Sequence, residues 1–223
     1  MITSTVENYV RQLYLEQRSA EGEMILMGRL AAAMGVVPGT ATSMVKALAD
    51  AGLVEYQPRS GVRLAASGEK LAIHMLRRHR LIELFLVKVL GLDWSTVHDE
   101  ADALEHAISD QVLERIDKLL GHPATDPHGD PIPTSKGHVH EPRRMSLANC
   151  PVGKRQRIAR VLDQDPEFLQ FIERQGLMPG ATITVGDREA AAEAVKIRIP
   201  RRPETSLGLA AAAKILVESP ASS

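Results

Sequence analysis

The sequence has one cysteine, few aromatic residues and no long apolar run. Cys150 alone cannot form an intrachain disulfide, and a single thiolate cannot build a metal cage, so we expect a reducing compartment. No apolar stretch approaches the roughly 20 residues that span a bilayer, and the N-terminus lacks the layout of a signal peptide. The sequence therefore predicts a cytoplasmic protein without membrane contact.

The composition is that of an ordinary folded protein. The 223 residues include 27 basic and 28 acidic side chains, so the chain has room for one large domain or two to three small ones and is close to neutral. All eight histidines fall between His74 and His140, in the part of the chain that is richest in acidic residues. Imidazole and carboxylate together suit Mn, Fe, Co, Ni and Zn, so this clustering favours a divalent-metal site.

The N-terminal third has the pattern of a winged helix-turn-helix. Apolar spacing predicts helices over Thr3–Gln17, Leu26–Met34 and Thr40–Ala51, with the tight connection VVPGT between the last two. A hairpin is predicted around residues 58–61, where Arg59 and Arg63 could reach phosphate. The second helix of such a unit enters the major groove, and its outward positions here are Thr40, Thr42, Ser43 and Lys46.

Two long helices and a small β domain are predicted to follow. Apolar stripes indicate helices over about Gly68–Leu90 and Val97–Leu120, which we interpret as a dimer interface. A proline- and glycine-rich loop spans residues 121–145, and short strands around one small helix then suggest an SH3-type barrel. The predicted fold is mainly α with small β parts, in domains 1–70 (DNA binding), 71–145 (metal binding and dimerisation) and 146–223 (SH3-like).

Histidine and carboxylate residues on the two long helices can form a metal site. His79 and Glu83 are four residues apart, and Asp102, Glu105 and His106 also share one helix face. Together the two helices supply His79, Asp102, Glu105 and His106, which could hold a five- or six-coordinate cation once the first helix adds an oxygen. The alternative is that these residues are the solvated faces of two amphipathic helices. The concentration of histidine favours the metal site.

A second cluster lies in the segment DPHGD. Asp126, His128 and Asp130 are spaced like loop ligands, with Asp165 available from the last domain. Aspartate also favours turns, so on spacing alone an ordinary turn-rich linker is the preferred interpretation.

The sequence resembles three-domain members of the diphtheria-toxin-repressor family of metal-dependent transcriptional repressors, and among them the manganese-responsive branch. The segments that carry the resemblance are TVENYVRQLY, RSGVRLAASG, RRHRLIELFL, VHDEADALEHAISD and GHPATDPHGDPIP. It implies an N-terminal winged helix-turn-helix, a helical dimerisation domain and a C-terminal SH3-like domain of the FeoA type. It also implies a homodimer that binds a double-stranded DNA operator.

The resemblance further implies particular site residues. The primary metal site would comprise Asn8, His79, Asp102, Glu105 and His106. The ancillary site would comprise Glu83, Asp126, His128 and Asp165, with His98 as a further candidate. DNA contacts would come from Pro38, Gly39, Thr40, Thr42, Ser43, Lys46 and Arg59.

Several positions depart from the pattern of the family. Asn8 stands where members commonly have aspartate or methionine, and Arg11 stands where two-domain manganese regulators have glutamate. Asp102 and Asp126 occupy positions that are often cysteine, so oxygen replaces sulfur. Harder donors favour Mn(II), with Fe(II) next and Zn(II), Co(II) or Ni(II) as substitutes in vitro.

Three alternatives stay open. The first is an iron(II)-responsive repressor of the same family, and the second is a winged-helix regulator whose effector is an organic molecule. The third is a metallo-hydrolase that uses the histidine and carboxylate cluster. The sequence contains no HExxH motif and every candidate ligand is committed to holding the ion, so we expect no enzyme.

Overall fold

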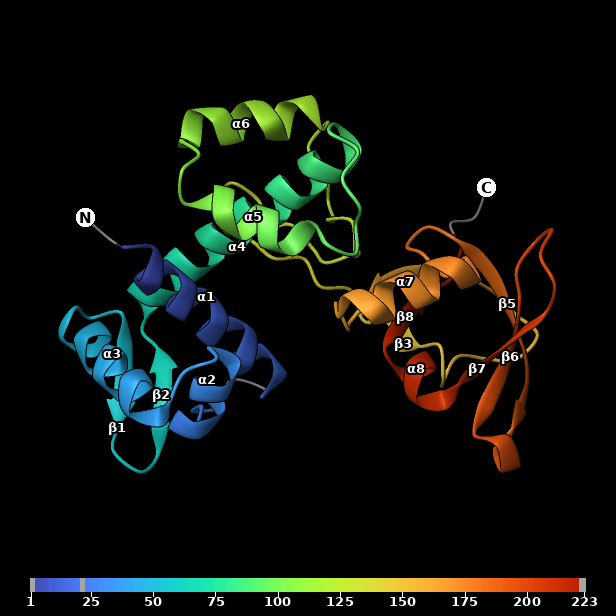
Figure 1. Ribbon diagram of the computed structural model, residues 1–223, viewed down its shortest axis with the longest axis horizontal. Coiled ribbons are helices and arrows are strands. Elements are labelled where there is room, and N and C mark those ends of the chain that lie inside the picture. Colours follow the sequence, from blue (N-terminus) through green and yellow to red (C-terminus); the bar gives the residue numbers. More distant parts are fainter. Residues whose placement is uncertain (1–2, 21–22, 221–223) are drawn as a thin grey trace. The chain divides into compact units, whose positions relative to one another are not determined.

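The computed structural model describes residues 3–20 and 23–220 (Figure 1). The chain forms two compact units. The first contains the residues up to His79, together with Glu105–Ile108 and Pro133–Val139. The second contains Arg80–Leu104, Ser109–Ile132 and the residues from His140 onward. No described helix combines the length and the apolar character that crossing a bilayer requires.

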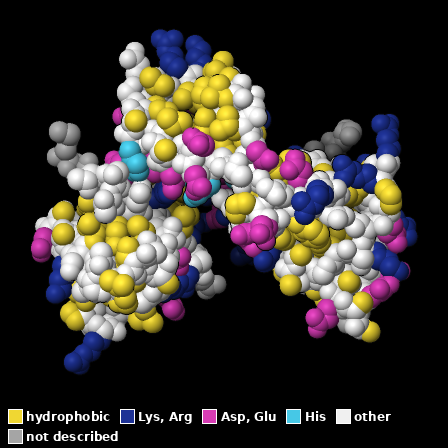
Figure 2. All heavy atoms as spheres, viewed as in Figure 1, with side chains coloured by type: hydrophobic (Ala, Val, Ile, Leu, Met, Phe, Trp, Pro, Cys, Tyr) yellow, Lys and Arg dark blue, Asp and Glu magenta, His cyan; other side chains and the backbone are white. Residues whose placement is uncertain are grey.

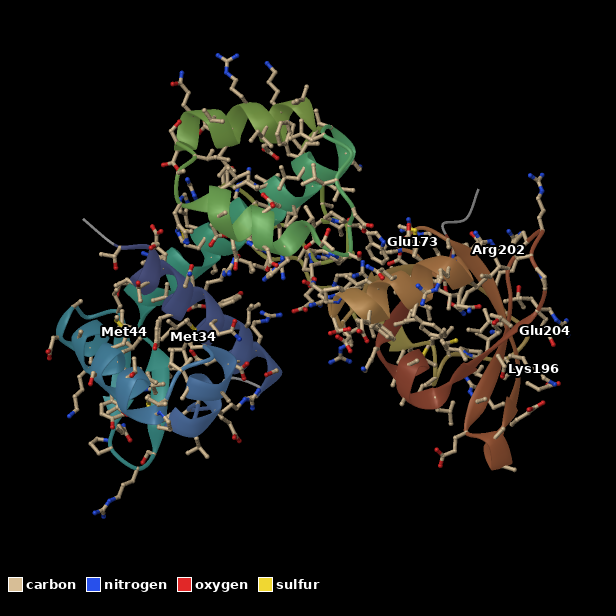
Figure 3. The ribbon with its side chains drawn as sticks, in the orientation of Figure 1. Met34, Met44, Glu173, Lys196, Arg202 and Glu204 are labelled. Atoms are coloured by element: carbon tan, nitrogen blue, oxygen red, sulfur yellow. The ribbon has the colours of Figure 1, made fainter. Side chains whose placement is uncertain are left out.

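The first unit is built on a helix-turn-helix. Its elements are α1 (Ser4–Ser19), α2 (Met27–Ala33), α3 (Pro38–Asp50), β1 (Val54–Gln57), β2 (Gly61–Leu64) and the first part of α4 (Ala66–Lys88). The helix expected from Thr40 begins earlier, because Pro38 occupies the first turn, where its fixed φ suits a helix. Tyr9, Leu13 and Leu48 lie in one buried core, against which Met34 and Met44 pack (Figure 3).

The predicted hairpin is present, and Ile25 forms a β-bridge with its second strand. β1 and β2 pair antiparallel, and Val62 of β2 also exchanges two backbone hydrogen bonds of 2.8 and 2.9 Å with Ile25. Gly61 sits beside this bridge with a φ of +123°, and a Cβ there would lie 2.5 Å from the carbonyl oxygen of Ile25. Only glycine allows so close an approach of the two backbones.

The single helix predicted over Val97–Leu120 is wrong. The structure has two helices there, α5 (Val97–Glu105) and α6 (Asp110–Leu119). The Arg78 guanidinium donates to the carbonyl oxygens of Glu105, at 2.9 Å, and of Ile108, so it satisfies acceptors at the end of α5. Ser109 then caps α6 by accepting the amide of Val112 at 3.3 Å. His106 consequently lies just beyond the end of α5.

The C-terminal part of the second unit is an antiparallel sheet with short helices. Its six strands lie in the order β3-β8-β4-β5-β6-β7. In chain order the elements are β3 (Met145–Ser146), β4 (Arg155–Val161), α7 (Pro166–Gln175), β5 (Thr182–Glu189), the 3₁₀ helix η1 (Ala190–Ala192), β6 (Ala194–Arg198), β7 (Thr205–Gly208), α8 (Leu209–Ala213) and β8 (Ile215–Glu218). Two α-helices thus accompany the strands where one was expected. Leu169 and Ile172 of α7 share a buried core with the sheet.

Cys150 provides a chemical probe of this sheet. Its side chain is fully buried in the core, and burial raises the pKa of its thiol. A raised pKa leaves less of the reactive thiolate at pH 8. We expect dithionitrobenzoate to react with the folded chain at least about 100-fold more slowly than with the chain in denaturant. Equal rates in the two conditions would show that the thiol is accessible.

Candidate metal centre

Three elements of the first unit bring ionisable and polar side chains to one place. α1 contributes Glu7 and Asn8, and one turn later Arg11; α4 contributes His79; the end of α5 contributes Glu105 and the following His106. We call these six residues the first cluster. On the face drawn in Figure 2, histidine side chains lie next to acidic ones.

His106 joins the end of α5 to α1. Its Nδ1 lies 2.6 Å from Glu7 Oε2, and its Nε2 lies 2.9 Å from Asn8 Oδ1. The same Nε2 is 3.4 Å from Oε1 of Glu105. An imidazole nitrogen, an amide oxygen and a carboxylate oxygen therefore converge, and all three are donors that a divalent cation accepts.

Glu105 is the most deeply buried member of the first cluster, with a side chain that is 0% exposed. Its Oε2 accepts a hydrogen bond from Arg11 Nη1 at 2.9 Å and lies 2.8 Å from His79 Nδ1. Its Oε1 has no hydrogen bond among the described residues. A buried carboxylate oxygen without a donor is costly, and a cation held beside it would remove that cost. The residues present therefore fit a metal ion.

Asp102, the remaining expected primary ligand, lies one turn before Glu105 on α5. Its side chain is half-buried, and Oδ2 is 3.8 Å from Nε2 of His98 on the preceding turn. A carboxylate and an imidazole thus also stand together on α5.

A second cluster of possible ligands lies within the second unit. Glu83, Asp126 and His128 are all buried, and one ligand atom from each lies within 4.8 Å of the others. His128 Nε2 is 2.8 Å from the carbonyl oxygen of Trp94, so this nitrogen carries the proton and donates. Nδ1 then keeps its lone pair; it has no hydrogen bond among the described residues and lies 4.0 Å from Glu83 Oε2. Metal-binding histidines are typically held in this way.

Negative charge is crowded at the second cluster. Burial raises the pKa of Asp126 well above its usual range, and the neighbouring Asp130 and Glu83 raise it further, while Arg80 acts in the opposite direction. Like charges in a buried site oppose ionisation, and a bound cation would relieve that opposition. These three ligands therefore fit a second divalent ion.

Two further expected ligands are placed differently. His98 is half-exposed, and its Nδ1 lies 3.2 Å from Glu83 Oε1, at the edge of the second cluster. Asp165 caps α7 instead: its Oδ1 accepts the amides of Glu167 and Phe168 at 3.0 and 3.1 Å. Asp165 is not part of the group formed by Glu83, Asp126 and His128.

The loop that carries Asp126 and His128 is fixed to the C-terminal sheet. We call residues 126–130 the ligand loop. The amide of Val161 on β4 donates to the carbonyl oxygen of His128 at 2.9 Å, and Gln164 donates to Asp130 Oδ2 at 2.7 Å. Arg160 of β4 also pairs with Asp130. These anchoring partners were not predicted from the sequence, because an arginine near the end of a strand and a glutamine just beyond it give no distinctive pattern.

The expected DNA contacts lie on α3 and on the wing. Pro38, Gly39, Thr40, Ser43, Lys46 and Arg59 are exposed, and Thr42 is half-exposed. The hydroxyls of Thr42 and Ser43 donate to carbonyl oxygens one turn earlier, at 2.8 and 3.0 Å. Arg59 stands in the hairpin turn with a φ of +70°. Arg63 instead pairs with Glu55 across the hairpin, at 2.8 Å.

Comparison with known sequence families covers most of the chain. Residues 1–62 match the iron dependent repressor N-terminal DNA binding domain, residues 65–134 match the iron dependent repressor metal binding and dimerisation domain, and residues 145–219 match the FeoA domain. Two of these three models describe an iron dependent repressor.

Individual relatives are also described as repressors. The iron-dependent repressor IdeR of Mycobacterium tuberculosis is 32% identical over 197 residues, which cover 82% of this chain and 84% of that protein. The diphtheria toxin repressor of Corynebacterium glutamicum is 35% identical over 132 residues, covering 59% of this chain and 57% of that protein.

Solved structures show the same architecture. A manganese-dependent transcriptional repressor in complex with manganese is 36% identical, with a TM-score of 0.83 over 96% of this chain and 99% of that one. ScaR with bound Zn²⁺ is 32% identical, with a TM-score of 0.75 over 96% of this chain and 99% of that one. The chain thus combines a helix-turn-helix, a helical dimerisation domain and an SH3-like FeoA domain, and it belongs to the diphtheria-toxin-repressor family of metal-dependent transcriptional repressors.

Proposed function

We propose that this repressor uses Mn(II) as its co-repressor. In this proposal a homodimer binds a double-stranded operator when the ion is bound, and so controls genes of metal uptake and homeostasis. The primary ion would be held by Asn8, His79, Asp102, Glu105 and His106. The ancillary ion would be held by Glu83, Asp126 and His128, with His98 or Asp165 completing the set.

The proposal depends on Oε1 of Glu105, which has no hydrogen bond among the described residues. It is buried beside Nε2 of His106, whose other close neighbour is the amide oxygen of Asn8. All the proposed ligands offer oxygen or nitrogen, and the single thiol of the chain, on Cys150, lies in the core of the C-terminal sheet. A donor set without sulfur favours Mn(II) over softer ions, although Zn(II) binds more tightly to most such sites in vitro.

The relatives include both metal specificities. A structure described as a manganese-dependent repressor is 36% identical, and the mycobacterial iron-dependent repressor is 32% identical. Iron(II) is therefore the second candidate, and the absence of sulfur from the ligand set is the observation that favours manganese.

The first cluster can link ion binding to DNA binding through α1. Glu7 and Asn8 stand on this helix, and Tyr9 and Leu13 of the same helix share a buried core with Leu48 of α3. Asn8 of α1 and Glu105 at the end of α5 would both hold the ion, whose positive charge would also offset the nearby carboxylate of Glu7. Fixing α1 against the end of α5 would then fix the DNA-reading helix, and a coupling of about 1–3 kcal/mol is typical of such linked sites.

A homodimer is supported by apolar residues on the helical domain. Leu104, Val112 and Leu119 on α5 and α6 are 38%, 48% and 66% exposed. They lie in the segment that matches a metal binding and dimerisation domain. Two copies would present two α3 helices to two half-sites of one operator.

The test is a metal titration of DNA binding. Duplexes that bind in the presence of Mn²⁺ are selected from a random pool, and their affinity is measured at fixed free Mn²⁺, Fe²⁺ and Zn²⁺ and at one stated salt concentration. We expect Mn²⁺ to raise the affinity by about 5- to 150-fold and a chelator to reverse the effect. Activation by Fe²⁺ at lower free concentration would instead assign iron, and binding that is insensitive to chelator would indicate an organic effector.

A further inference from the structure

Arg11 lies inside the first cluster and contacts two of the proposed metal ligands, His79 and Glu105. Its side chain is only 10% exposed. Its Nη1 is 2.6 Å from Nδ1 of His79 and donates to Oε2 of Glu105 at 2.9 Å. A guanidinium has no acceptor and stays charged at any physiological pH, so a hydrogen bond from Arg11 to His79 uses the Nδ1 lone pair, whereas a hydrogen bond from Nδ1 to Glu105 Oε2, 2.8 Å away, needs a proton on Nδ1. Arg11 therefore occupies a lone pair of Glu105 Oε2 and lies against Nδ1 of His79, the second proposed metal ligand.

Charge balance explains why a buried arginine is stable there. Glu105 is completely buried, and without a neighbouring cation its carboxylate would be an unpaired buried charge, which is strongly destabilising. Arg11 provides that cation. A dication placed at the same lone pairs would meet the guanidinium at close range, and two positive charges in a buried site repel each other strongly.

We propose that Arg11 is an internal competitor of the metal ion. In the metal-free chain it neutralises Glu105 and holds His79, and it has to leave these atoms when an ion binds. Arg11 thereby sets the free metal concentration at which the repressor responds. This inference rests on the proposed metal site and adds to it the residue that tunes its affinity.

The proposal can be tested against the opposite role for Arg11, in which it helps the ligands to bind the ion. If Arg11 instead oriented His79 and Glu105 for the ion, its removal would weaken metal binding. The competitor role predicts tighter binding and a less stable metal-free chain, so the two roles differ in sign.

The experiment compares Arg11→Met with Arg18→Met, a matched change on the exposed last turn of the same helix. Mn²⁺ binding to the full chain is followed through the electron paramagnetic resonance signal of free aqueous Mn²⁺, and metal-free thermal unfolding is followed by circular dichroism. For Arg11→Met we expect binding at the primary site about tenfold or more tighter. We also expect a lower metal-free Tm and a larger rise in Tm on adding Mn²⁺. Arg18→Met should behave like the unaltered chain.

A second variant covers the case in which Arg11→Met does not fold. Arg11→Gln removes the charge but keeps an N–H donor for Glu105, and it should also bind Mn²⁺ more tightly. Unchanged or weaker binding in whichever variant folds would overturn the inference. If the unaltered chain bound no Mn²⁺ that depends on Glu105, the proposed metal site would fail instead, and the two failures are therefore distinguishable.

Discussion

Replacing Glu105 with glutamine is expected to abolish Mn²⁺-dependent operator binding. The substitution keeps the shape of the side chain but removes the buried charge that contacts Arg11, His79 and His106. An ion bound at this position would lose its most deeply buried anionic ligand. The ratio of DNA affinities with and without Mn²⁺ should fall from the 5- to 150-fold range typical of allosteric coupling to about 1. Gel shifts over a Mn²⁺ titration measure this ratio.

The control is Glu114→Gln, a matched change at an exposed position of α6. It should leave the Mn²⁺ dependence intact. Removing one partner of a buried ion pair can destabilise a protein by about 3–5 kcal/mol, so the folded state of Glu105→Gln must be checked by thermal unfolding. His106→Gln, at a side chain that is 20% exposed, provides a second variant with a smaller effect on folding. A full Mn²⁺ response in both folded variants would contradict the proposed primary site.

Replacing Gly129 with alanine should destabilise the chain and loosen the ligand loop. Gly129 has a φ of +87°, and a Cβ there would lie 2.0 Å from the carbonyl oxygen of Ala159 and 2.7 Å from Cα of Arg160. Both contacts are with backbone, so no side-chain rotation relieves them. The left-handed φ costs roughly 1–2 kcal/mol and forced overpacking about 1–3 kcal/mol, which gives a loss of about 2–5 kcal/mol in the free energy of unfolding. Denaturant titration measures this loss.

Gly121→Ala separates the two contributions. Gly121 has a similar φ of +75°, but nothing lies within 4 Å of its added Cβ. The Gly121→Ala variant should therefore lose only the roughly 1–2 kcal/mol that the left-handed φ costs. A substantially greater loss for Gly129→Ala would measure the contact between the ligand loop and β4. Equal losses in the two variants would mean that the loop can move off the strand at little cost.

Local patterns predicted the helix-turn-helix well. Apolar residues at helical spacing and a proline–glycine connection are signals of short range, and the core of α1, α2 and α3 follows from them. The break between α5 and α6 was missed, because apolar periodicity continues through residues 106–109. Arg78, about 30 residues away in the sequence, satisfies carbonyl oxygens at the end of α5, and a long-range contact of this kind leaves no local pattern, whereas the Ser109 cap of α6 was an available local signal.

The sequence predicted the metal clusters only in part, because some of their contacts join residues far apart in the chain. Helical spacing placed His79, Glu105 and His106 on suitable faces, and the resemblance to a family added Asn8. Neither helical spacing nor the resemblance could show that Glu7 contacts His106 or that Arg11 contacts Glu105. Both contacts depend on how α1 packs against the end of α5. Spacing four residues apart on α1 does place Glu7 and Arg11 on one face, and this was the available signal.

The contact of Arg78 with the end of α5 has a consequence for comparing related chains. The planar guanidinium of Arg78 helps to end α5, because it donates hydrogen bonds to the carbonyl oxygens of Glu105 and Ile108. In a relative with an aliphatic residue there, these two carbonyl oxygens would lose their donor, and the cap at the position of Ser109 would be left to mark the start of the next helix. Residue 78 therefore contributes to the division between α5 and α6, although it belongs to neither ligand set.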